Sequence, residues 1–178
     1  MRVIAGEARG RRLVAPPGYD VRPTSDRVRE ATFNALWSMG AIEDATVLDL
    51  FAGTGALGIE AISRGARRVT FVEKDRAARA AIEENLERCG FADRATVIPG
   101  DALTLVGSIG PVDLALVDPP YDYEHWEDLL PLIRATTVVI EAGREIPLPA
   151  GWTSRRKKRY RTTVVEVAQP SFQPGAPR

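Results

Sequence analysis

The run Asp118-Pro119-Pro120-Tyr121 is the part of the sequence whose residue types most directly suggest chemistry. It follows Val112–Val117, an apolar stretch typical of a buried strand. Two successive prolines keep the chain extended after that strand and remove two N–H donors, so the turn presents hydrogen-bond acceptors. A carboxylate beside a carbonyl suits a nitrogen that carries two N–H donors, as the exocyclic amines of nucleic-acid bases do.

The reaction predicted for this turn is methylation of such an amine. The amine lone pair is delocalised into the ring, so the nitrogen attacks a methyl group poorly. Hydrogen bonds to the Asp118 carboxylate and the Pro119 carbonyl favour a more tetrahedral nitrogen, and Asp118 can take up the released proton. Tyr121 offers a face on which the base can stack, a contact worth about 1–3 kcal/mol. The predicted catalytic residues are Asp118, Pro119, Pro120 and Tyr121.

A second motif, Gly53-x-Gly55-x-x-Gly58, follows the predicted strand Thr46–Leu50 and opens a helical stretch. Such a turn binds nucleotide-like cofactors because backbone without Cβ atoms can approach the ligand closely. Glu73 ends the next predicted strand, where a carboxylate can accept hydrogen bonds from two ribose hydroxyls. By itself this pattern serves a nicotinamide-dependent oxidoreductase as well as an enzyme that uses S-adenosylmethionine.

Two further acids favour S-adenosylmethionine. Asp49 ends the first predicted strand, where a carboxylate can engage the cationic amino-acid part of that cofactor but would repel a pyrophosphate. Asp101 follows the third predicted strand and is suited to accept a hydrogen bond from the adenine amine. Because ligands of such sheets bind at the carboxyl ends of the strands, we expect Asp49, Glu73 and Asp101 to lie at one site.

The alternation of β-rich and helical stretches predicts an α/β protein with a mostly parallel sheet covered on both faces. The predicted strands are Thr46–Leu50, Arg68–Glu73, Ala95–Pro99, Val112–Val117 and Thr137–Glu141, followed by an antiparallel hairpin of Trp152–Arg161 and Thr162–Ala168. The predicted helices are Leu57–Arg64, Arg76–Arg88, Glu124–Arg134 and one that runs from the capping run Pro23-Thr24-Ser25-Asp26 to about Met39.

The domain organisation is expected to be simple. Residues 1–20 are predicted to form a small β-hairpin extension from Val3–Ala5 and Arg12–Ala15, residues 21–169 one catalytic domain, and residues 170–178 a disordered tail. No apolar stretch approaches the roughly 20 residues that cross a bilayer, and the N-terminus lacks the apolar segment of a signal peptide. The protein is therefore expected to be cytoplasmic.

Charge is balanced overall, with 24 basic and 24 acidic residues, but basic residues concentrate at the two ends of the chain. The first 30 residues contain seven arginines, and residues 155–161 contain six basic residues and no acid. Two such runs around a catalytic domain favour phosphate binding. The residues predicted to bind nucleic acid are Arg2, Arg9, Arg11, Arg12, Arg22, Arg27, Arg29, Arg156, Lys157 and Arg159.

Other chemistries find little support in the sequence. Cys89 is the single cysteine and follows a helical stretch, so it is interpreted as a packing residue, and carbon-5 methylation of a pyrimidine, which needs a cysteine nucleophile, is disfavoured. His125 is the single histidine and is interpreted as a surface or capping residue. Without a cluster of cysteines and histidines, no metal site is expected.

Taken together, Asp49–Gly58, Glu73, Gly100-Asp101 and Asp118–Tyr121 resemble the ordered motifs of class I, Rossmann-like, amino-methylating methyltransferases. The N-terminal segments are more specific and resemble the RsmD family, bacterial enzymes that methylate N2 of a guanine in 16S ribosomal RNA. These segments are Arg2-Val3-Ile4-Ala5-Gly6, Gly10-Arg11-Arg12-Leu13 and Arg22-Pro23-Thr24-Ser25-Asp26-Arg27-Val28-Arg29-Glu30-Ala31.

The resemblance, which runs from residue 2 to about residue 168, implies a seven-stranded sheet, S-adenosylmethionine as cofactor, and 16S rRNA as partner, within an assembled or partly assembled small subunit. It implies no membrane and no obligate protein partner. Asp118 and Pro119 would hold the guanine amine, Tyr121 would stack on the base, and the N-terminal arginines would grip RNA. The implied cofactor-binding residues are Asp49, Phe51, Gly53, Thr54, Gly55, Glu73, Lys74, Asp101, Ala102 and Asp118.

Four alternatives stay open at this point. A DNA adenine-N6 methyltransferase uses the same Asp-Pro-Pro-Tyr motif, although such enzymes generally carry a separate base-reading region, for which this chain has little room. Glutamine methylation in a protein typically has Asn in place of Asp118. A non-catalytic RNA-binding factor leaves the intact motifs without a purpose, and a nicotinamide-dependent oxidoreductase leaves Asp49 and the double proline unexplained.

Overall fold

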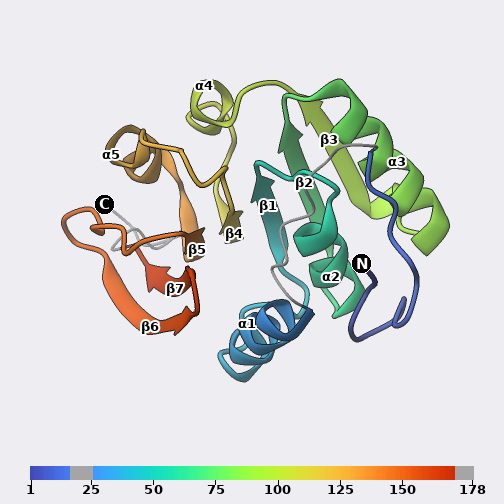
Figure 1. Ribbon diagram of the computed structural model, residues 1–178, viewed down its shortest axis with the longest axis horizontal. Coiled ribbons are helices and arrows are strands. Elements are labelled where there is room, and N and C mark those ends of the chain that lie inside the picture. Colours follow the sequence, from blue (N-terminus) through green and yellow to red (C-terminus); the bar gives the residue numbers. More distant parts are fainter. Residues whose placement is uncertain (17–25, 171–178) are drawn as a thin grey trace.

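A single mixed sheet forms the centre of the molecule in the computed structural model, which describes residues 1–16 and 26–170 (Figure 1). Within these residues the strand order is β3-β2-β1-β4-β5-β7-β6. The strands are β1 (Thr46–Leu50), β2 (Arg68–Glu73), β3 (Ala95–Pro99), β4 (Val112–Val117), β5 (Ala135–Ala142), β6 (Thr153–Tyr160) and β7 (Thr163–Gln169). The first five run parallel, whereas β7 pairs antiparallel with β5 and with β6.

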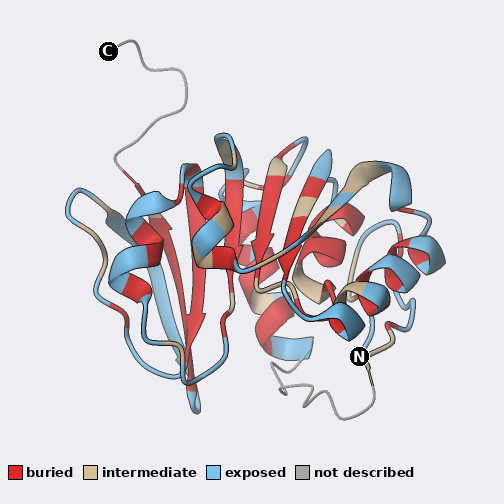
Figure 2. Ribbon diagram, turned by 90° about the horizontal axis from the view of Figure 1, so that it is seen from above, coloured by how far each residue is buried: buried red, intermediate tan, exposed pale blue. Residues whose placement is uncertain are grey.

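Helices cover both faces of the sheet. They are α1 (Asp26–Ser38), α2 (Ala56–Ser63), α3 (Arg76–Cys89), α4 (Ala102–Val106) and α5 (Trp126–Leu129), with 3-10 turns at Ala92–Arg94 and Leu130–Leu132. One hydrophobic core joins the sheet to α1, α2 and α3, and a second joins it to α4 and α5. Figure 2 shows the buried strands between helices whose outer sides are exposed. The strands between the two cores are therefore mostly apolar along their whole length.

The register of the parallel strands brings their carboxyl ends into one row. Leu50, the last residue of β1, lies beside Val72 of β2 on one side and Val117 of β4 on the other. After β1 the chain turns toward α2 on one face, and after β4 it continues to α5 on the opposite face. The two connections diverge at this edge, which is the arrangement that leaves a ligand crevice in open α/β sheets.

The third glycine of the Gly53-x-Gly55-x-x-Gly58 motif has a packing role. A Cβ atom added to Gly58 would lie 2.3 Å from the ring of Phe71 on β2. A side chain at this position would push α2 away from the sheet, since the ring is fully buried. Close packing of the helix thus keeps the preceding loop over the ends of β1 and β2.

The N-terminal arm, residues 1–16, is fastened to α2 and α3. Its chain reversal contains one antiparallel bridge, between Arg2 and Arg12, in place of the two short strands predicted from the sequence. The Glu60 carboxylate on α2 accepts hydrogen bonds from the backbone N–H groups of Ile4 at 2.8 Å and Ala5 at 3.1 Å. The arm is therefore an ordered part of the fold held by a buried carboxylate.

Most predicted elements are present, with some differences in extent. The predicted helix Glu124–Arg134 is wrong in length, because α5 has only four residues and Pro131 allows just a 3-10 turn after it. The short helix α4 was not predicted; Asp101 caps it by accepting from the Thr104 N–H at 3.2 Å. Most of the predicted capping run, residues 23–25, lies outside the described residues. None of the described helices is long and apolar enough to cross a membrane.

Glu60→Gln is expected to destabilise the fold by about 3–5 kcal/mol, because it breaks a buried ion pair. Glu60 is fully buried and also accepts from Arg64 Nε at 2.6 Å, while Arg29 Nε lies 3.9 Å away. The measurement is the urea dependence of unfolding. Glu84→Gln, which breaks an exposed pair with Arg88 on α3, is the control and should change the unfolding free energy by less than about 1 kcal/mol. Equal effects of the two variants would show that Glu60 does not anchor the arm.

Candidate active site

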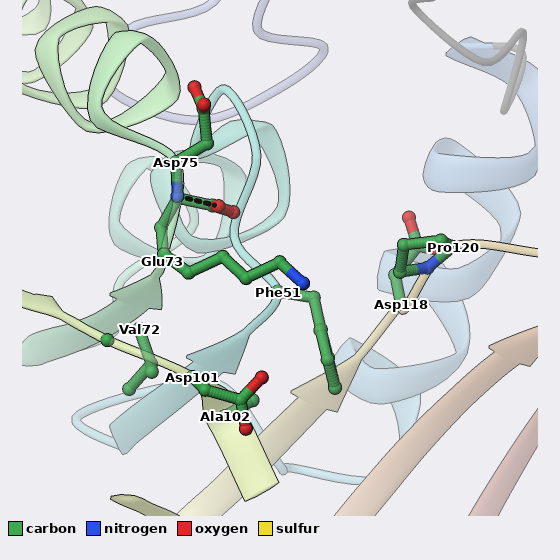
Figure 3. Close-up of a pocket in the computed structure, with 10 residues that line it drawn as sticks. Phe51, Val72, Glu73, Asp75, Asp101, Ala102, Asp118 and Pro120 are labelled. Atoms are coloured by element: carbon green, nitrogen blue, oxygen red, sulfur yellow. Dashed lines mark hydrogen bonds between the residues drawn. The ribbon is translucent and has the colours of Figure 1, made fainter. Parts of the chain in front are cut away.

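A cavity lies at the carboxyl edge of the sheet, where four successive parallel strands end (Figure 3). Its wall contains residues from the segments that follow or end β1, β2, β3 and β4. They are Phe51, Val72, Glu73, Lys74, Asp75, Gly100, Asp101, Ala102, Asp118 and Pro120. Figure 3 shows the acidic side chains of Glu73, Asp101 and Asp118 arriving at the cavity from three different strand ends. The sheet thus brings together residues that are up to 69 positions apart in the sequence, namely Phe51 and Pro120.

Glu73 holds the loops after β1 and β2 together. One carboxylate oxygen accepts from the Gly53 N–H at 2.8 Å, and the other accepts from the Asp75 N–H at 2.8 Å. The side chain is buried but lines the cavity. A carboxylate oxygen has two lone pairs, so each oxygen keeps capacity for a hydroxyl donor. The geometry is therefore compatible with the predicted contact to ribose hydroxyls.

Asp49 has a different place from the one expected. Its side chain is 1% exposed and does not line the cavity, and its carboxylate accepts from the Gly58 N–H at 2.8 Å. Asp49 therefore lies behind the glycine loop, and its predicted contact with the cofactor stays a prediction. Burial raises the pKa of Asp49 well above its ordinary value, and the nearby charges of Asp118 and Glu73 raise it further.

The carboxylates at this edge create a negative region that suits a cationic ligand. Asp49, Glu73 and Asp118 are close enough for the last two to disfavour ionisation of the first. A ligand with a sulfonium and an ammonium group relieves this repulsion, whereas a pyrophosphate adds to it. Among the ten residues that line the described cavity, Lys74 is the one cation. The donor set therefore fits S-adenosylmethionine better than a dinucleotide.

Aromatic residues form one side of the site. Phe51 has a positive φ of 59°, and its ring meets Tyr123 edge to face at 5.0 Å between centroids. Tyr123 in turn contacts the buried Trp126 at 5.4 Å. Burial, with a smaller contribution from the Asp101 and Asp128 charges, raises the pKa of Tyr123 to about 12. Sequence reasoning missed Tyr123, although an aromatic residue two positions after Tyr121 was a signal that could have been followed.

Tyr121 is placed as a platform beside the cavity. Its side chain is 54% exposed, and its hydroxyl lies 3.1 Å from the Thr163 hydroxyl at the start of β7. A Cβ atom added to Gly143 would lie 2.8 Å from the ring, so the ring rests against bare backbone after β5. Pro119 is buried and Asp118 is half-buried. A planar group can therefore reach the ring from the solvent side.

Asn85 also supports the site, and sequence reasoning missed it. This fully buried side chain on α3 accepts from the Val14 N–H at 2.8 Å and donates to the Val14 and Thr54 carbonyls, each at 3.0 Å. It thereby joins the N-terminal arm to the glycine loop. An asparagine in an otherwise helical stretch of sequence gives no signal of this contact, because both partners are distant in the chain.

The residues predicted to bind nucleic acid have mixed outcomes. Arg2, Arg9, Arg11, Arg12 and Arg27 are exposed, and Arg22 lies outside the described residues.

The prediction for Arg29 is wrong. This side chain is 2% exposed, lies 3.2 Å from the Asp26 carboxylate and donates to the Arg2 carbonyl, so it cannot reach RNA.

The three predicted residues on β6 are exposed. They are Arg156, Lys157 and Arg159.

The sheet order, the loop after β1 and the Asp-Pro-Pro-Tyr turn after β4 define a class I methyltransferase. The family model described as Conserved hypothetical protein 95 matches residues 1–169, and the chain belongs to this family, the RsmD family that its sequence resembles.

Relatives and solved structures agree with this assignment. The chain is 37% identical over 169 residues to Ribosomal RNA small subunit methyltransferase D of Escherichia coli, covering 89% of this chain and 84% of that protein. It is 34% identical over 172 residues to the protein of that name from Haemophilus influenzae, covering 89% and 88%. The structure of the Escherichia coli protein yhhF matches with a TM-score of 0.87 at 36% identity, covering 97% of this chain and 99% of that one. The predicted fold class and methyltransferase activity are confirmed, and a nicotinamide-dependent oxidoreductase is excluded.

Asp49→Asn is expected to raise stability at neutral pH. It is also expected to weaken cofactor binding about tenfold, or about 1.4 kcal/mol, because it removes one of three acids whose negative charge attracts a cationic ligand, even without direct contact. An acid whose pKa is raised by folding loses stability as pH rises from its ordinary value of 3.8 toward its folded value. Asn keeps an acceptor for Gly58 but cannot ionise, so its advantage over the wild type should grow from pH 4 to pH 8.

Denaturant unfolding at several pH values and calorimetric titration with S-adenosylmethionine measure the two effects. Asp93→Asn makes the same change at an exposed position and serves as the control, for which the difference from wild type should stay flat with pH. A variant at Asp49 that loses stability steadily as pH rises would contradict this account.

Proposed function

We propose that this enzyme transfers the methyl group of S-adenosylmethionine to the exocyclic N2 amine of a guanine in 16S rRNA of the small ribosomal subunit. One observation carries the proposal. The Asp118-Pro119-Pro120 turn contributes to the same cavity as Glu73 and Asp101, so the amine-holding residues and the cofactor-binding residues meet at one place. The exposed ring of Tyr121 lies directly after that turn.

Several residues would hold the cofactor. Glu73 would accept from the ribose hydroxyls and Asp101 from the adenine amine, with Phe51 and Ala102 as apolar walls; all four line the cavity. The loop that contains Gly53, Thr54 and Gly55 is fixed by Glu73 and Asn85 and would face the amino-acid part. When bound, S-adenosylmethionine supplies a methyl group already activated by the positive charge on sulfur.

The chain's own residues would activate the acceptor nitrogen. The Asp118 carboxylate accepts one N–H of the guanine amine and the Pro119 carbonyl accepts the other, which favours a more tetrahedral nitrogen whose lone pair is less delocalised into the ring. Tyr121 holds the ring from one face, so the nitrogen cannot rotate away. Asp118 accepts the proton that the nitrogen loses, and because its side chain is half-buried it can pass that proton to water.

Ribosomal RNA is the favoured substrate for two reasons. The relatives that match over most of their length carry rRNA methyltransferase in their names. The rival substrate, adenine in DNA, requires a surface that reads a duplex, and between Asp101 and Asp118 the described chain has room only for the five-residue helix α4 and the sheet strand β4. We further propose that the enzyme works in the cytoplasm on an assembled or partly assembled small subunit.

Asp118→Ala is expected to lower kcat for methyl transfer by roughly 10²–10³-fold, because it removes both an acceptor for the amine and the proton acceptor. The assay uses labelled S-adenosylmethionine with small subunits lacking the modification, naked small-subunit rRNA and unmethylated DNA as acceptors. Nuclease digestion identifies the methylated nucleoside. Asp122→Ala removes a carboxylate four positions along the same loop and should leave kcat within about threefold.

Label in N2-methylguanine that disappears in Asp118→Ala would support the reaction, the substrate and the residue together. Label in DNA as N6-methyladenine would replace the proposed substrate with the rival one. Full activity of Asp118→Ala would overturn the proposed role of this carboxylate whatever the acceptor.

Tyr121→Ala should lower kcat/KM by an amount that matches lost stacking, about 1–3 kcal/mol or roughly 5–150-fold. Tyr121→Phe keeps the ring and removes the hydroxyl that contacts Thr163, so it should stay within about threefold of wild type. Steady-state kinetics on the preferred acceptor separate the two cases. If Phe proves as harmful as Ala, the hydroxyl and not the ring is what the reaction needs.

A further inference from the structure

The edge strand β6 presents two different basic faces. A groove between α1 and the β6–β7 hairpin runs along one of them. The residues that line this groove are Ala31, Thr32, Ala35, Arg156, Lys158, Tyr160, Val165 and Val167. The pairing of Arg156 with Val167 and of Lys158 with Val165 confirms the side, since both valines belong to the core that contains α1. Arg156 and Lys158 therefore stand over the groove.

The opposite face of β6 is neutralised within the protein. Lys157 Nζ lies 3.3 Å from carboxylate oxygens of both Glu145 and Glu166, and Arg159 lies 3.7 Å from Glu145. The hydrogen bond with Glu145 raises the pKa of Lys157. Because Glu166 is 2% exposed, Lys157 is needed there to balance a buried charge. These two residues, which were predicted to bind nucleic acid, have internal partners.

The charges over the groove lack such partners. Across residues 1–16 and 26–170, no carboxylate lies within 4 Å of Arg156 or Lys158. Lys158 Nζ instead lies 5.1 Å from the centre of the Tyr160 ring. On the other wall, Ala31 and Ala35 have small side chains, so the groove is shallow there. Basic residues on an edge strand can prevent pairing between sheets, but that role does not explain why Lys157 and Arg159 have carboxylates within 4 Å while Arg156 and Lys158 have none among the described residues.

The groove leads to the catalytic turn. Tyr160 at its upper end pairs across the hairpin with Thr163, whose hydroxyl lies 3.1 Å from the Tyr121 hydroxyl. A chain of contacts therefore connects Tyr121 with the groove. Tyr121 contacts Thr163, Thr163 pairs with Tyr160, and the Tyr160 ring contacts Lys158, which lies on the same face of β6 as Arg156. The hairpin tip beside Tyr160 adds a further exposed cation, Arg161, whose φ of 53° fixes a tight turn.

We propose that this groove binds the phosphate backbone of the RNA strand that carries the target nucleotide, with Arg156 and Lys158 on successive phosphates. This inference rests on the proposed function and adds the path that the RNA strand takes across the protein. The strand would pass down the α1 side of β6 while its target base is held at Tyr121. Cations at alternate positions of a strand lie about 7 Å apart, which is close to the spacing of adjacent phosphates in an extended chain.

The test compares Arg156→Ala, Lys158→Ala and their double variant with Arg155→Ala on the same strand. Arg155 does not line the groove, and its Nε donates to the Gln169 side chain at 2.7 Å. Binding of small-subunit rRNA and of small subunits is measured at salt concentrations from about 50 to about 200 mM, a range over which phosphate contacts weaken strongly. Methyl transfer is measured separately. The double variant should bind roughly tenfold or more weakly, with a log–log salt slope reduced by about 1.4–1.8, and with KM raised while kcat is kept.

Each outcome decides something. Equal losses in Arg155→Ala and Arg156→Ala, or an unchanged salt slope in the double variant, would overturn the groove and leave the proposed function intact. Weaker binding to subunits with unchanged binding to naked rRNA would mean that the groove holds a ribosomal protein, and the proposal would be wrong. RNA binding that depends on the groove without methyl transfer to guanine would keep the groove and refute the proposed function. A wild-type protein that binds neither acceptor would refute both.

Discussion

The alignment of parallel strand ends at one edge of the sheet is the constraint on which the rest of this structure depends. Leu50, Val72 and Val117 lie side by side, so the residues that follow them must share one small volume. The chain after β1 leaves toward one face and the chain after β4 toward the other. A cavity lies between the two connections, and its wall contains residues that follow β1 together with residues that follow β4, although the two segments are distant in the sequence.

Holding this edge open has an electrostatic cost. The Asp49 carboxylate is buried close to Asp118 and Glu73, and its ionisation is disfavoured by burial and by both charges. A fold selected for stability alone would not place three acids together. The arrangement suits a site that receives a cationic ligand, since the positive charge of such a ligand offsets the repulsion among the three acids.

The site is also supported from behind by polar groups whose partners are far apart in the chain. Glu60 fixes the N-terminal arm to α2, and Asn85 joins that arm to the glycine loop. Both side chains are fully buried, so each satisfied hydrogen bond replaces one that water cannot make. The arm is thereby part of the scaffold of the cofactor site, and the burial of Arg29 has the same origin, because that guanidinium completes the network around Glu60.

The α/β class, most strands of the sheet and the two motifs at the strand ends could be predicted from the sequence, because hydrophobic patterns and the positions of glycine and proline are local. Tertiary structure alone decided which charged residues face solvent. Arg29 and Arg27 have similar sequence surroundings, yet one is buried against Glu60 and the other is exposed. Lys157 and Lys158 are adjacent in one basic run, yet the alternation of side chains along β6 turns one toward Glu166 and the other toward α1. Pairing, burial and direction depend on partners from distant segments, which no local pattern contains.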